Sequence, residues 1–258
     1  MDKFRAEITE QKELIKDIFS MWVKAPELVA EAHSGQFVSV YSKDASRLLP
    51  RPISICDLDK EKGLLRLVYR IAGAGTLEFS QLTTGDTVDI LGPLGNGYDM
   101  NCKNPVLLGG GIGIPPMLRL ARELREAGIP KENLSVVLGY RDTAFLLEEF
   151  EEIATVYTTS DNGAVGIKGN VIDGIKEYNI TGDMIFSCGP TPMLRAVKAY
   201  SEESGIRAQL SLEEKMACGV GACLACVCES TEVDDHSKVH NKRICKDGPV
   251  FYAEEVVL

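Results

Sequence analysis

The sequence lacks any long hydrophobic run. No stretch of 18 apolar residues occurs in its 258 residues, and the N-terminus, MDKFRAEITEQKELIKDIF, alternates apolar and charged residues where a signal peptide would carry an apolar core. We therefore expect a cytoplasmic protein that neither crosses nor binds a membrane.

An excess of positive charge is also missing. Lysine and arginine number 28 against 38 aspartates and glutamates, which gives a net charge of −10 and argues against a nucleic acid as partner. The composition, 45% hydrophobic and 26% charged, is that of a soluble globular protein, and the length suffices for two domains and a small appendage.

No serine, histidine and acid arrangement suited to hydrolysis stands out. Cysteine, in contrast, occurs eight times, and the chain shows no export signal. Because the cytosol keeps thiols reduced, these cysteines favour metal binding or redox chemistry over a disulfide framework.

The apolar pattern changes along the chain. Up to about residue 99, short apolar runs such as QFVSVY, RPISICDL and DTVDILGPLG alternate with turn signals, which predicts an antiparallel β barrel. From Pro105, apolar strands alternate with amphipathic stretches, which is typical of an α/β parallel sheet with crossover helices. We predict a barrel over 1–99, a parallel-sheet domain over 100–206 and a third segment over 207–258.

Half of the cysteines lie in one short stretch of the third segment, SLEEKMACGVGACLACVCES. Cys218, Cys223 and Cys226 have the spacing of plant-type ferredoxins, and Cys245 is a distant fourth thiol, so the pattern predicts a 2Fe-2S cluster. Gly219 and Gly221 would let the loop turn and aim amide hydrogens at sulfur. The alternative is a structural zinc site made from these cysteines together with Cys228, His236 and His240.

Two elements of the middle region suggest a dinucleotide site. In PVLLGGGIGIPPM a strand leads through a glycine turn into a helix that should begin near Pro115 and Pro116, where a pyrophosphate could approach the backbone. The turn contains Gly109, Gly110, Gly111 and Gly113, without the usual G-x-G-x-x-G spacing, so a tight packing turn is the alternative. The second element, SCGPTPML, follows another strand, although Cys188 could be a plain buried thiol.

The barrel region carries two possible phosphate sites. LLPRPISI offers Arg51, whose guanidinium can make two charge-assisted hydrogen bonds to phosphate, and Ser54 as a hydroxyl partner. YRIAGAGTLEFSQL predicts a strand, a glycine turn and a short helix capped near Thr76. Taken singly, each is equally compatible with an ordinary turn.

Together, RPIS, GAGT, GGGIGIPPM, CGPTPM and the cysteine set, in this order, resemble the ferredoxin-NADP reductase superfamily with a C-terminal 2Fe-2S segment. Within it the chain resembles the electron-transfer subunits of type B dihydroorotate dehydrogenase. The resemblance covers nearly the whole chain and is far more specific than any one motif.

The resemblance implies a set of cofactor-binding residues. FAD would be bound with Ser54 near the flavin ring and Arg51 on the diphosphate, and Ile53 stands where a tyrosine is common in the superfamily. The full implied FAD set is Arg51, Pro52, Ile53, Ser54, Val68, Tyr69, Arg70, Gly75 and Thr76. NAD would be received by Gly109, Gly110, Gly111, Gly113, Cys188, Gly189 and Pro190, and the cluster would be held by Cys218, Cys223, Cys226 and Cys245.

The resemblance also implies a partner. Electrons from dihydroorotate, oxidised at FMN in a separate catalytic subunit, would pass through the cluster to FAD and then to NAD, in an assembly of two copies of each chain serving pyrimidine biosynthesis. The alternatives are a subunit of a ferredoxin-dependent NADP oxidoreductase, a sulfide dehydrogenase or a hydrogenase, or a non-catalytic iron–sulfur or zinc module. Four available cysteines favour the dihydroorotate system, since some relatives replace one with aspartate.

Two further expectations concern specificity and docking. Asp161, after the strand ATVYTTS, would accept hydrogen bonds from an adenosine ribose and repel a 2′-phosphate, which favours NAD, although Arg141 could accommodate that phosphate. A glycine-rich cluster loop should lie near the surface, where Val220, Leu224 and Val227 are candidate contacts with the catalytic subunit, or else pack the loop onto the flavin domain.

Overall fold

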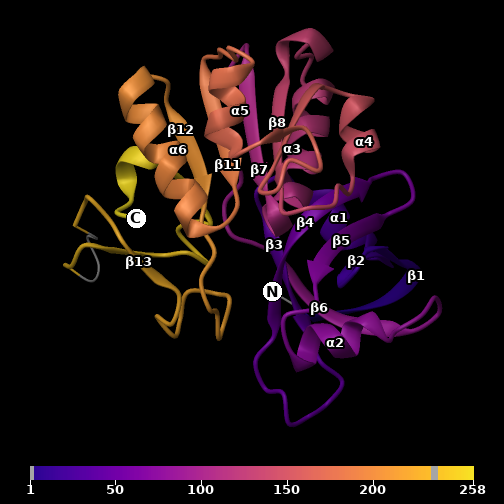
Figure 1. The fold of residues 1–258 in the computed structure, drawn as a ribbon. Coiled ribbons are helices and arrows are strands. Elements are labelled where there is room, and N and C mark those ends of the chain that lie inside the picture. Colours follow the sequence, from indigo (N-terminus) through magenta and orange to yellow (C-terminus); the bar gives the residue numbers. More distant parts are fainter. Residues whose placement is uncertain (1–2, 234–237) are drawn as a thin grey trace.

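The computed structural model describes residues 3–233 and 238–258, and it contains a closed barrel, a larger sheet and a small C-terminal segment beside them (Figure 1). The barrel has the strand order β1-β2-β5-β4-β3-β6, and every pairing is antiparallel. Its strands are β1 (Lys3–Ile15), β2 (Ile18–Lys24), β3 (Phe37–Tyr41), β4 (Arg51–Asp59), β5 (Leu64–Arg70) and β6 (Thr87–Leu94). The predicted barrel is therefore confirmed.

Strand alternation divides the barrel residues between two faces. On β3, Val38 and Val40 join the barrel core, whereas Phe37 belongs to a different apolar cluster shared with the other sheet and the C-terminal segment. Because successive side chains of a strand point to opposite faces, Ser39 lies on the outer face with Phe37. Two short helices, α1 (Pro26–Glu31) and α2 (Ala74–Ser80), cover the barrel, and Phe79 of α2 is buried in its core.

The second sheet has the order β10-β9-β8-β7-β11-β12-β15 and is parallel except for its last strand. Its strands are β7 (Pro105–Gly110), β8 (Ser135–Tyr140), β9 (Thr155–Ser160), β10 (Ile167–Lys168), β11 (Met184–Cys188), β12 (Ala208–Ser211) and β15 (Val250–Tyr252). The helices are α3 (Ile114–Glu126), α4 (Leu147–Glu151), α5 (Val171–Glu177) and α6 (Thr191–Ser204), with short 3-10 turns η1 (Gly111–Gly113), η2 (Lys131–Asn133) and η3 (Ala253–Glu255). The predicted parallel sheet is confirmed.

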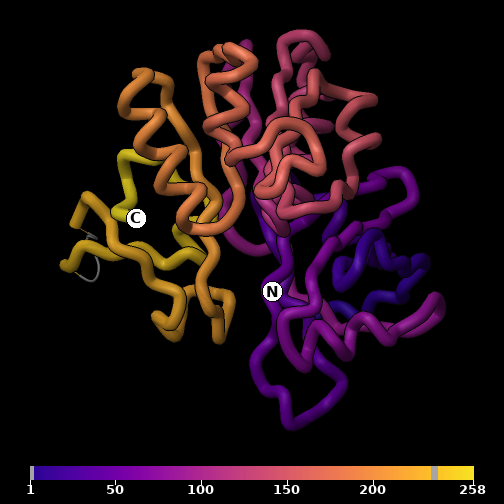
Figure 2. Tube along the Cα trace, in the orientation of Figure 1, coloured from indigo at the N-terminus to yellow at the C-terminus, as the bar shows by residue number. Residues whose placement is uncertain are grey.

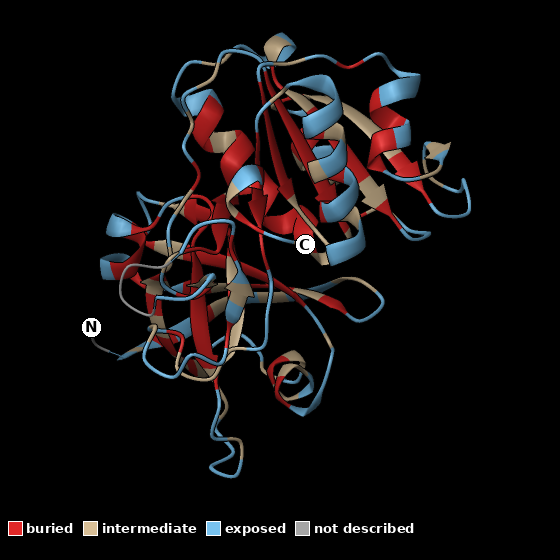
Figure 3. Ribbon diagram, turned by 90° about the vertical axis from the view of Figure 1, so that its left-hand side faces the viewer, coloured by how far each residue is buried: buried red, intermediate tan, exposed pale blue. Residues whose placement is uncertain are grey.

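Burial explains why these strands are apolar throughout. All six residues of β7 are buried, and the helices turn their exposed faces to solvent while the strands between them are covered on both sides (Figure 3). In the described residues, no helix is long and apolar enough to cross a membrane.

Two local predictions are confirmed, the helix that begins near Pro115 and Pro116 and the short helix capped near Thr76. The helix after the glycine turn begins at Ile114, with Pro115 and Pro116 in its first turn, and a 3-10 turn over Gly111–Gly113 precedes it. The helix α2 begins at Ala74, so Thr76 lies inside its first turn, where its hydroxyl accepts the amide hydrogens of Ala72 at 2.8 Å and Gly73 at 3.3 Å.

The C-terminal part of the chain contributes strands to the second sheet and also lies beside the barrel. Strands β12 and β15 follow residue 207 yet belong to the seven-stranded sheet, and the described residues between them form the hairpin of β13 (Val227–Glu229) and β14 (Asn241–Arg243). Figure 2 shows this orange and yellow segment beside the barrel. The predicted boundary at 207 stays a prediction.

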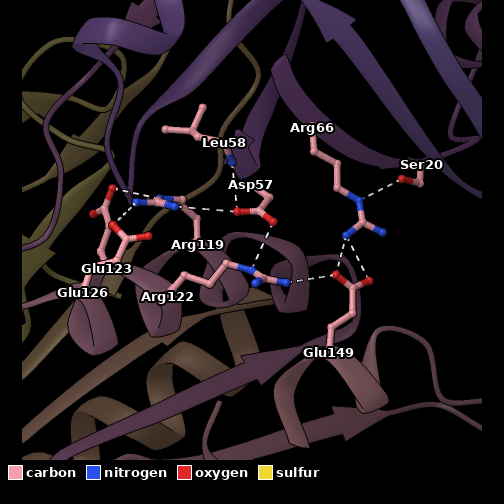
Figure 4. A network of polar contacts seen from close by, with 9 residues as sticks. All are labelled: Ser20, Asp57, Leu58, Arg66, Arg119, Arg122, Glu123, Glu126 and Glu149. Atoms are coloured by element: carbon pink, nitrogen blue, oxygen red, sulfur yellow. Dashed lines mark hydrogen bonds and ion pairs between the residues drawn. The ribbon is translucent and has the colours of Figure 1, made fainter. Parts of the chain in front are cut away.

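A buried ionic network joins the barrel to the sheet domain (Figure 4). Asp57 of β4 lies 3.1 Å from Arg122 Nε and 3.7 Å from Arg119 Nη1, both on α3. Arg66 of β5 donates to both carboxylate oxygens of Glu149 on α4, at 2.7 and 2.9 Å. Burial raises the pKa of Asp57 above its ordinary value despite these arginines. Asp57, Arg66 and Arg119 are almost fully buried, so loss of a partner would leave a buried charge unpaired. These ion pairs therefore hold the barrel and the sheet domain in one relative position.

Candidate functional site: three cofactor regions

The first region lies where strand β4 meets helix α2. A Cβ placed on Gly75 would overlap the guanidinium of Arg51, so the arginine lies flat against the first turn of the helix. Arg51 also donates to the carbonyl of Leu49. The guanidinium therefore lies beside the first turn of α2, where helix amides lack intrahelical acceptors, and this arrangement, called the flavin cradle below, suits a diphosphate.

The other residues implied for FAD are distributed over both sides of the barrel wall. Ile53, Val68 and Tyr69 are buried, Tyr69 stacks on Phe19 with ring centroids 6.0 Å apart, and Arg70 is exposed. Ser54 is paired with Phe37 across β4 and β3, and paired residues of two strands point to the same side. Ser54 therefore lies on the outer face of the barrel together with Phe37.

The second region is the carboxyl edge of β7 and β11. These strands are neighbours with Gly109 opposite Cys188, and the strand order runs outward from them in opposite directions, so the glycine turn and the Cys188–Pro190 turn meet at the switch point of the sheet. A Cβ on Gly113 would overlap the backbone of Cys188, and one on Gly110 would overlap Met193 Sδ. The backbone here is open enough for a pyrophosphate only because these positions lack side chains.

Cys188 lies at the end of β11 and is half-buried. Removal from water raises the pKa of its thiol to about 12, so the sulfur is a neutral thiol at physiological pH.

Arg141 and Asp161, the residues expected to determine the preference for NAD or NADP, directly follow the paired ends of β8 and β9. Tyr140 is opposite Ser160 in the register of β8 and β9, so Arg141 and Asp161 emerge next to each other at the same edge, both exposed. The amide of Asp161 donates to the carbonyl of Tyr140 at 3.3 Å. The structure thus brings together two side chains with opposite expected effects on a 2′-phosphate.

The third region is the cysteine loop. Gly219 and Gly221 have φ values of +72° and +83°, and Leu224 also adopts a left-handed conformation at +57°, so the loop curls tightly. Cys226 and Cys245 are buried, Cys218 is half-buried and Cys223 is exposed.

Backbone amides converge on the sulfurs of this loop. Cys218 Sγ accepts from Val220 at 3.5 Å and Ala222 at 3.3 Å, and Cys245 Sγ accepts from Gly221 at 3.1 Å. Burial acts to raise the pKa of Cys218, but these amides and the adjacent Cys223 outweigh it and lower the value to about 6. Burial and the neighbouring Cys226 raise that of Cys245 to about 12. Four thiols and several inward amides fit a cluster whose sulfurs carry negative charge.

The zinc alternative would draw on Cys228, His236 and His240 in addition to the four cysteines. Within the described ranges, no group of three or more histidine, cysteine, aspartate or glutamate side chains is placed to hold a single metal ion. His240 is exposed, and His236 lies outside the described residues. Cys228 lies on β13 and its thiol donates to the carbonyl of Lys242 at 3.5 Å, and burial raises its pKa to about 11.

The cysteine segment is seated directly on the barrel. Cys226 and Cys245 share an apolar cluster with Phe37 of β3 and Leu94 of β6. Just beyond β6, Asn96 donates through its amide to Gly248 at 2.6 Å and through its side chain to the carbonyl of Asp247 at 3.0 Å. The cluster region is thus held against the outer barrel face that also carries Ser54.

Sequence reasoning missed several of these residues. Phe37, Leu94 and Asn96 form the seat of the cysteine segment, and Met193 lies between the two glycine turns of the sheet. Asn96 in the sequence GNG carried a turn signal but no sign of its distant partner. Phe37, Leu94 and Asn96 belong to no spaced motif, so only the tertiary structure identifies them, whereas Met193 is the last residue of the CGPTPM motif.

The fold and its three regions define a flavin- and nicotinamide-dependent reductase with an added iron–sulfur segment. Sequence profiles agree: an oxidoreductase FAD-binding domain matches residues 5–98, an oxidoreductase NAD-binding domain matches 107–199, and the iron–sulfur cluster binding domain of dihydroorotate dehydrogenase B matches 213–257. FAD-, NAD- and cluster-binding domains are therefore all present.

The chain belongs to the family of dihydroorotate dehydrogenase B electron-transfer subunits. It is 42% identical over 257 residues to the subunit named "Dihydroorotate dehydrogenase B (NAD(+)), electron transfer subunit" from Listeria monocytogenes, with 97% of each chain covered. It is 40% identical to the protein of the same name from Streptococcus mutans, covering 97% of this chain and 96% of that one.

Solved structures support the same fold. One described as an NADH-dependent reduced ferredoxin-NADP oxidoreductase, studied for flavin-based electron bifurcation, superimposes with a TM-score of 0.87 at 33% identity, covering 98% of this chain and 89% of that one. A phthalate dioxygenase reductase superimposes with a TM-score of 0.62 at 18% identity over 94% of both chains, which shows the fold alone.

Proposed function

We propose that this chain is the electron-transfer subunit of an NAD-dependent dihydroorotate dehydrogenase, linking a catalytic subunit to NAD in pyrimidine biosynthesis. The single observation that carries the proposal is the cysteine segment seated on the barrel face that also presents Ser54. The proposal is supported because Cys226 and Cys245 pack in the same apolar cluster as Phe37, which is paired with Ser54. When bound, FAD would exchange a hydride with the nicotinamide and single electrons with the cluster.

The residues of the chain would bind, orient and shield these groups. Arg51 and the α2 amides would hold the FAD diphosphate, and Ser54 would face the flavin ring. The glycine turn after β7 and the Cys188–Pro190 turn would hold NAD so that its ring meets the flavin. Cys218, Cys223, Cys226 and Cys245 would hold the 2Fe-2S cluster, with the amides of Val220, Gly221 and Ala222 on its thiolates.

The family name implies a separate catalytic partner, and the finer proposal is an FMN-containing subunit in a cytoplasmic assembly with two copies of each chain. The docking face would be the open side of the cysteine loop. Val220, Leu224 and Val227 are 44%, 57% and 38% exposed, so these apolar side chains do not pack the loop onto the barrel. Beside the exposed Cys223, they form a surface that a partner could cover.

Co-expression with an FMN-containing dihydroorotate dehydrogenase subunit tests the proposal. We expect the two chains to co-purify as a heterotetramer and to reduce NAD with dihydroorotate, whereas this chain alone should oxidise NADH with dyes only. The variants Val220→Asp and Leu224→Asp should weaken assembly and spare dye reduction, because a buried carboxylate would face an apolar contact. Dihydroorotate oxidation by the isolated chain would contradict the subunit model, as would variants that lose dye activity and keep assembly.

NAD is the proposed nucleotide because Asp161 stands at the edge of β9. The ratio of kcat/KM for NADH and NADPH with an artificial acceptor measures this choice. We expect NADH to be preferred and Asp161→Ala to reduce the preference. A clear preference of the unsubstituted chain for NADPH would contradict this and would mean that the attraction of Arg141 for the 2′-phosphate outweighs the repulsion by Asp161.

A ferredoxin-linked NADP oxidoreductase subunit is the second candidate, favoured by the TM-score of 0.87 to a protein of that description. The four cysteines and the higher identity to dihydroorotate dehydrogenase subunits favour the first proposal. Ferredoxin-dependent reduction of NADP without dihydroorotate turnover, in the complex that co-purifies, would favour the second.

A further inference from the structure

One buried hydroxyl between the flavin and cluster regions has no hydrogen-bond partner among the residues that the structure describes. Ser39 of β3 is 1% exposed, and its Oγ makes no hydrogen bond to any described residue. A hydroxyl removed from water without a partner costs free energy comparable to a lost hydrogen bond. Such a group in a folded protein therefore calls for a specific explanation.

The direction in which Ser39 points follows from its strand register. Its neighbours Val38 and Val40 face the barrel core, so Ser39 faces outward. It is paired with Pro52 of the β4 flavin strand on one side and with Leu91 of β6 on the other. The hydroxyl therefore lies in the middle of the outer face on which the cysteine segment is seated.

The Ser39 hydroxyl lies next to Gly219, at the start of the cysteine loop. A Cβ added to Gly219 would lie 2.9 Å from Ser39 Oγ and 3.5 Å from Leu94 Cδ1, so Ser39 is in direct contact with the residue after Cys218. On its other side, Cys218 Sγ already accepts the amide hydrogens of Val220 and Ala222. Ser39 is thus an unused O–H donor beside a loop whose other donors converge on sulfur.

We propose that the Ser39 hydroxyl donates a hydrogen bond to a sulfur of the 2Fe-2S centre, either the Cys218 thiolate or a sulfide, and thereby raises the reduction potential of that centre. The inference rests on the proposed function. Reduction adds negative charge to the cluster sulfurs, and a hydrogen bond to them strengthens with that charge, so the donor favours the reduced state. The hydroxyl would act from the flavin-binding barrel, which makes Ser39 a residue that sets the potential of the centre next to the flavin.

A potentiometric titration of the purified chain, with the reduced cluster followed by electron paramagnetic resonance, tests this. Loss of one hydrogen bond in Ser39→Ala should make one-electron reduction about tenfold less favourable, a downward shift of ~59 mV. Ser39→Thr keeps the hydroxyl and should restore most of the potential. The matched control is Thr159→Val, which removes another buried hydroxyl without a described partner, in β9 of the other domain, and should leave the cluster potential unchanged.

Several results would overturn the inference. They are an unchanged cluster potential in Ser39→Ala, an equal shift in Thr159→Val, or a shift confined to the FAD potential, which would assign the hydroxyl to the flavin. Loss of the cluster from Ser39→Ala with FAD retained would also overturn it, because one hydrogen bond does not hold a four-thiolate centre. Iron and sulfide are measured first in the unsubstituted chain, so that absence of a cluster counts against the proposed function instead.

Discussion

The seven-stranded sheet and the cysteine segment inserted between its last two strands are stabilised in different ways. Every residue of β7 is buried, and the face of α3 that packs on the sheet is apolar. The cysteine segment has two strands of three residues each, and two of its few buried side chains, Cys226 and Cys245, are proposed cluster ligands. The sheet can therefore form from hydrophobic burial alone, whereas the segment depends on what its thiols bind.

The flavin cradle resembles the sheet in that the fold forms it without help from a cofactor. Arg51 lies against Gly75 through contacts that the barrel fold itself supplies. Two of the three cofactor regions are thus formed by the fold, and the third is completed by its cofactor. The predictions below separate these cases.

The largest effect is expected from the cluster thiols. Cys226→Ser or Cys245→Ser should abolish the 2Fe-2S centre, because a buried ligand cannot be replaced by solvent. Cys228→Ser should retain it, since that thiol bonds to the Lys242 carbonyl. Iron and acid-labile sulfide per chain measure the result. FAD content should be normal in all three variants, and tightly bound zinc without iron or sulfide in the unsubstituted chain would refute the assignment.

A large-to-small substitution in the core of the sheet should lower the stability of the fold and leave the cluster in place. Leu107 of β7 is fully buried, and Leu107→Ala should lower the free energy of unfolding by about 2–5 kcal/mol. Denaturant unfolding followed by circular dichroism measures this loss. Folded Leu107→Ala should keep its full iron and sulfide content. Cluster loss at a denaturant concentration that leaves the sheet folded would show that the two regions are coupled more tightly than proposed.

FAD binding should be sensitive to a substitution at Gly75 and tolerant of one at Gly73. In Gly75→Ala the new methyl group must displace Arg51, and the loss of its charge-assisted bonds should weaken FAD binding about 10- to 100-fold. Gly73→Ala is the matched control, because no atom lies within 4 Å of a Cβ there. Isothermal titration of apoprotein with FAD measures both. Equal affinities in the two variants would remove Arg51 from the diphosphate site.

The smallest effect concerns the strand that follows the cysteine segment. Tyr252 of β15 donates to Asp99 at 2.7 Å, and this bond lowers the pKa of Asp99 below its ordinary value of 3.8. An acid whose pKa is lowered by folding adds stability above the ordinary value and loses it as pH falls through the lowered one. Tyr252→Phe should therefore cost less than about 1 kcal/mol at pH 7, because Asp99 is exposed. The difference in unfolding free energy from the unsubstituted chain should shrink below pH 3.8, and a difference that grows there would contradict this pairing.

Much of the fold could be predicted from local pattern. The alternation of apolar runs indicates both the barrel and the parallel sheet, and the spacing of Cys218, Cys223 and Cys226 indicates the cluster loop. Such patterns depend only on residues close together in the sequence, and this is why the strands and the cysteine loop could be predicted from them.

The seat of the cluster could not be predicted in this way. Ser39 and Asn96 contact residues more than 150 positions away, and neither lies in a spaced motif. Strand β12 was assigned to the third segment because the cysteines follow it, yet its pairing with β11 depends on a crossover through α6.

Hydrogen–deuterium exchange of the holoprotein and of cluster-free protein tests the central claim most directly. If the cluster orders the cysteine segment while the barrel and sheet form independently, removing iron should increase exchange over 213–247. Exchange in β7, β8 and the barrel strands should stay unchanged. Equal protection of 213–247 in the two forms, or a loss of protection spread evenly over the sheet, would contradict the account.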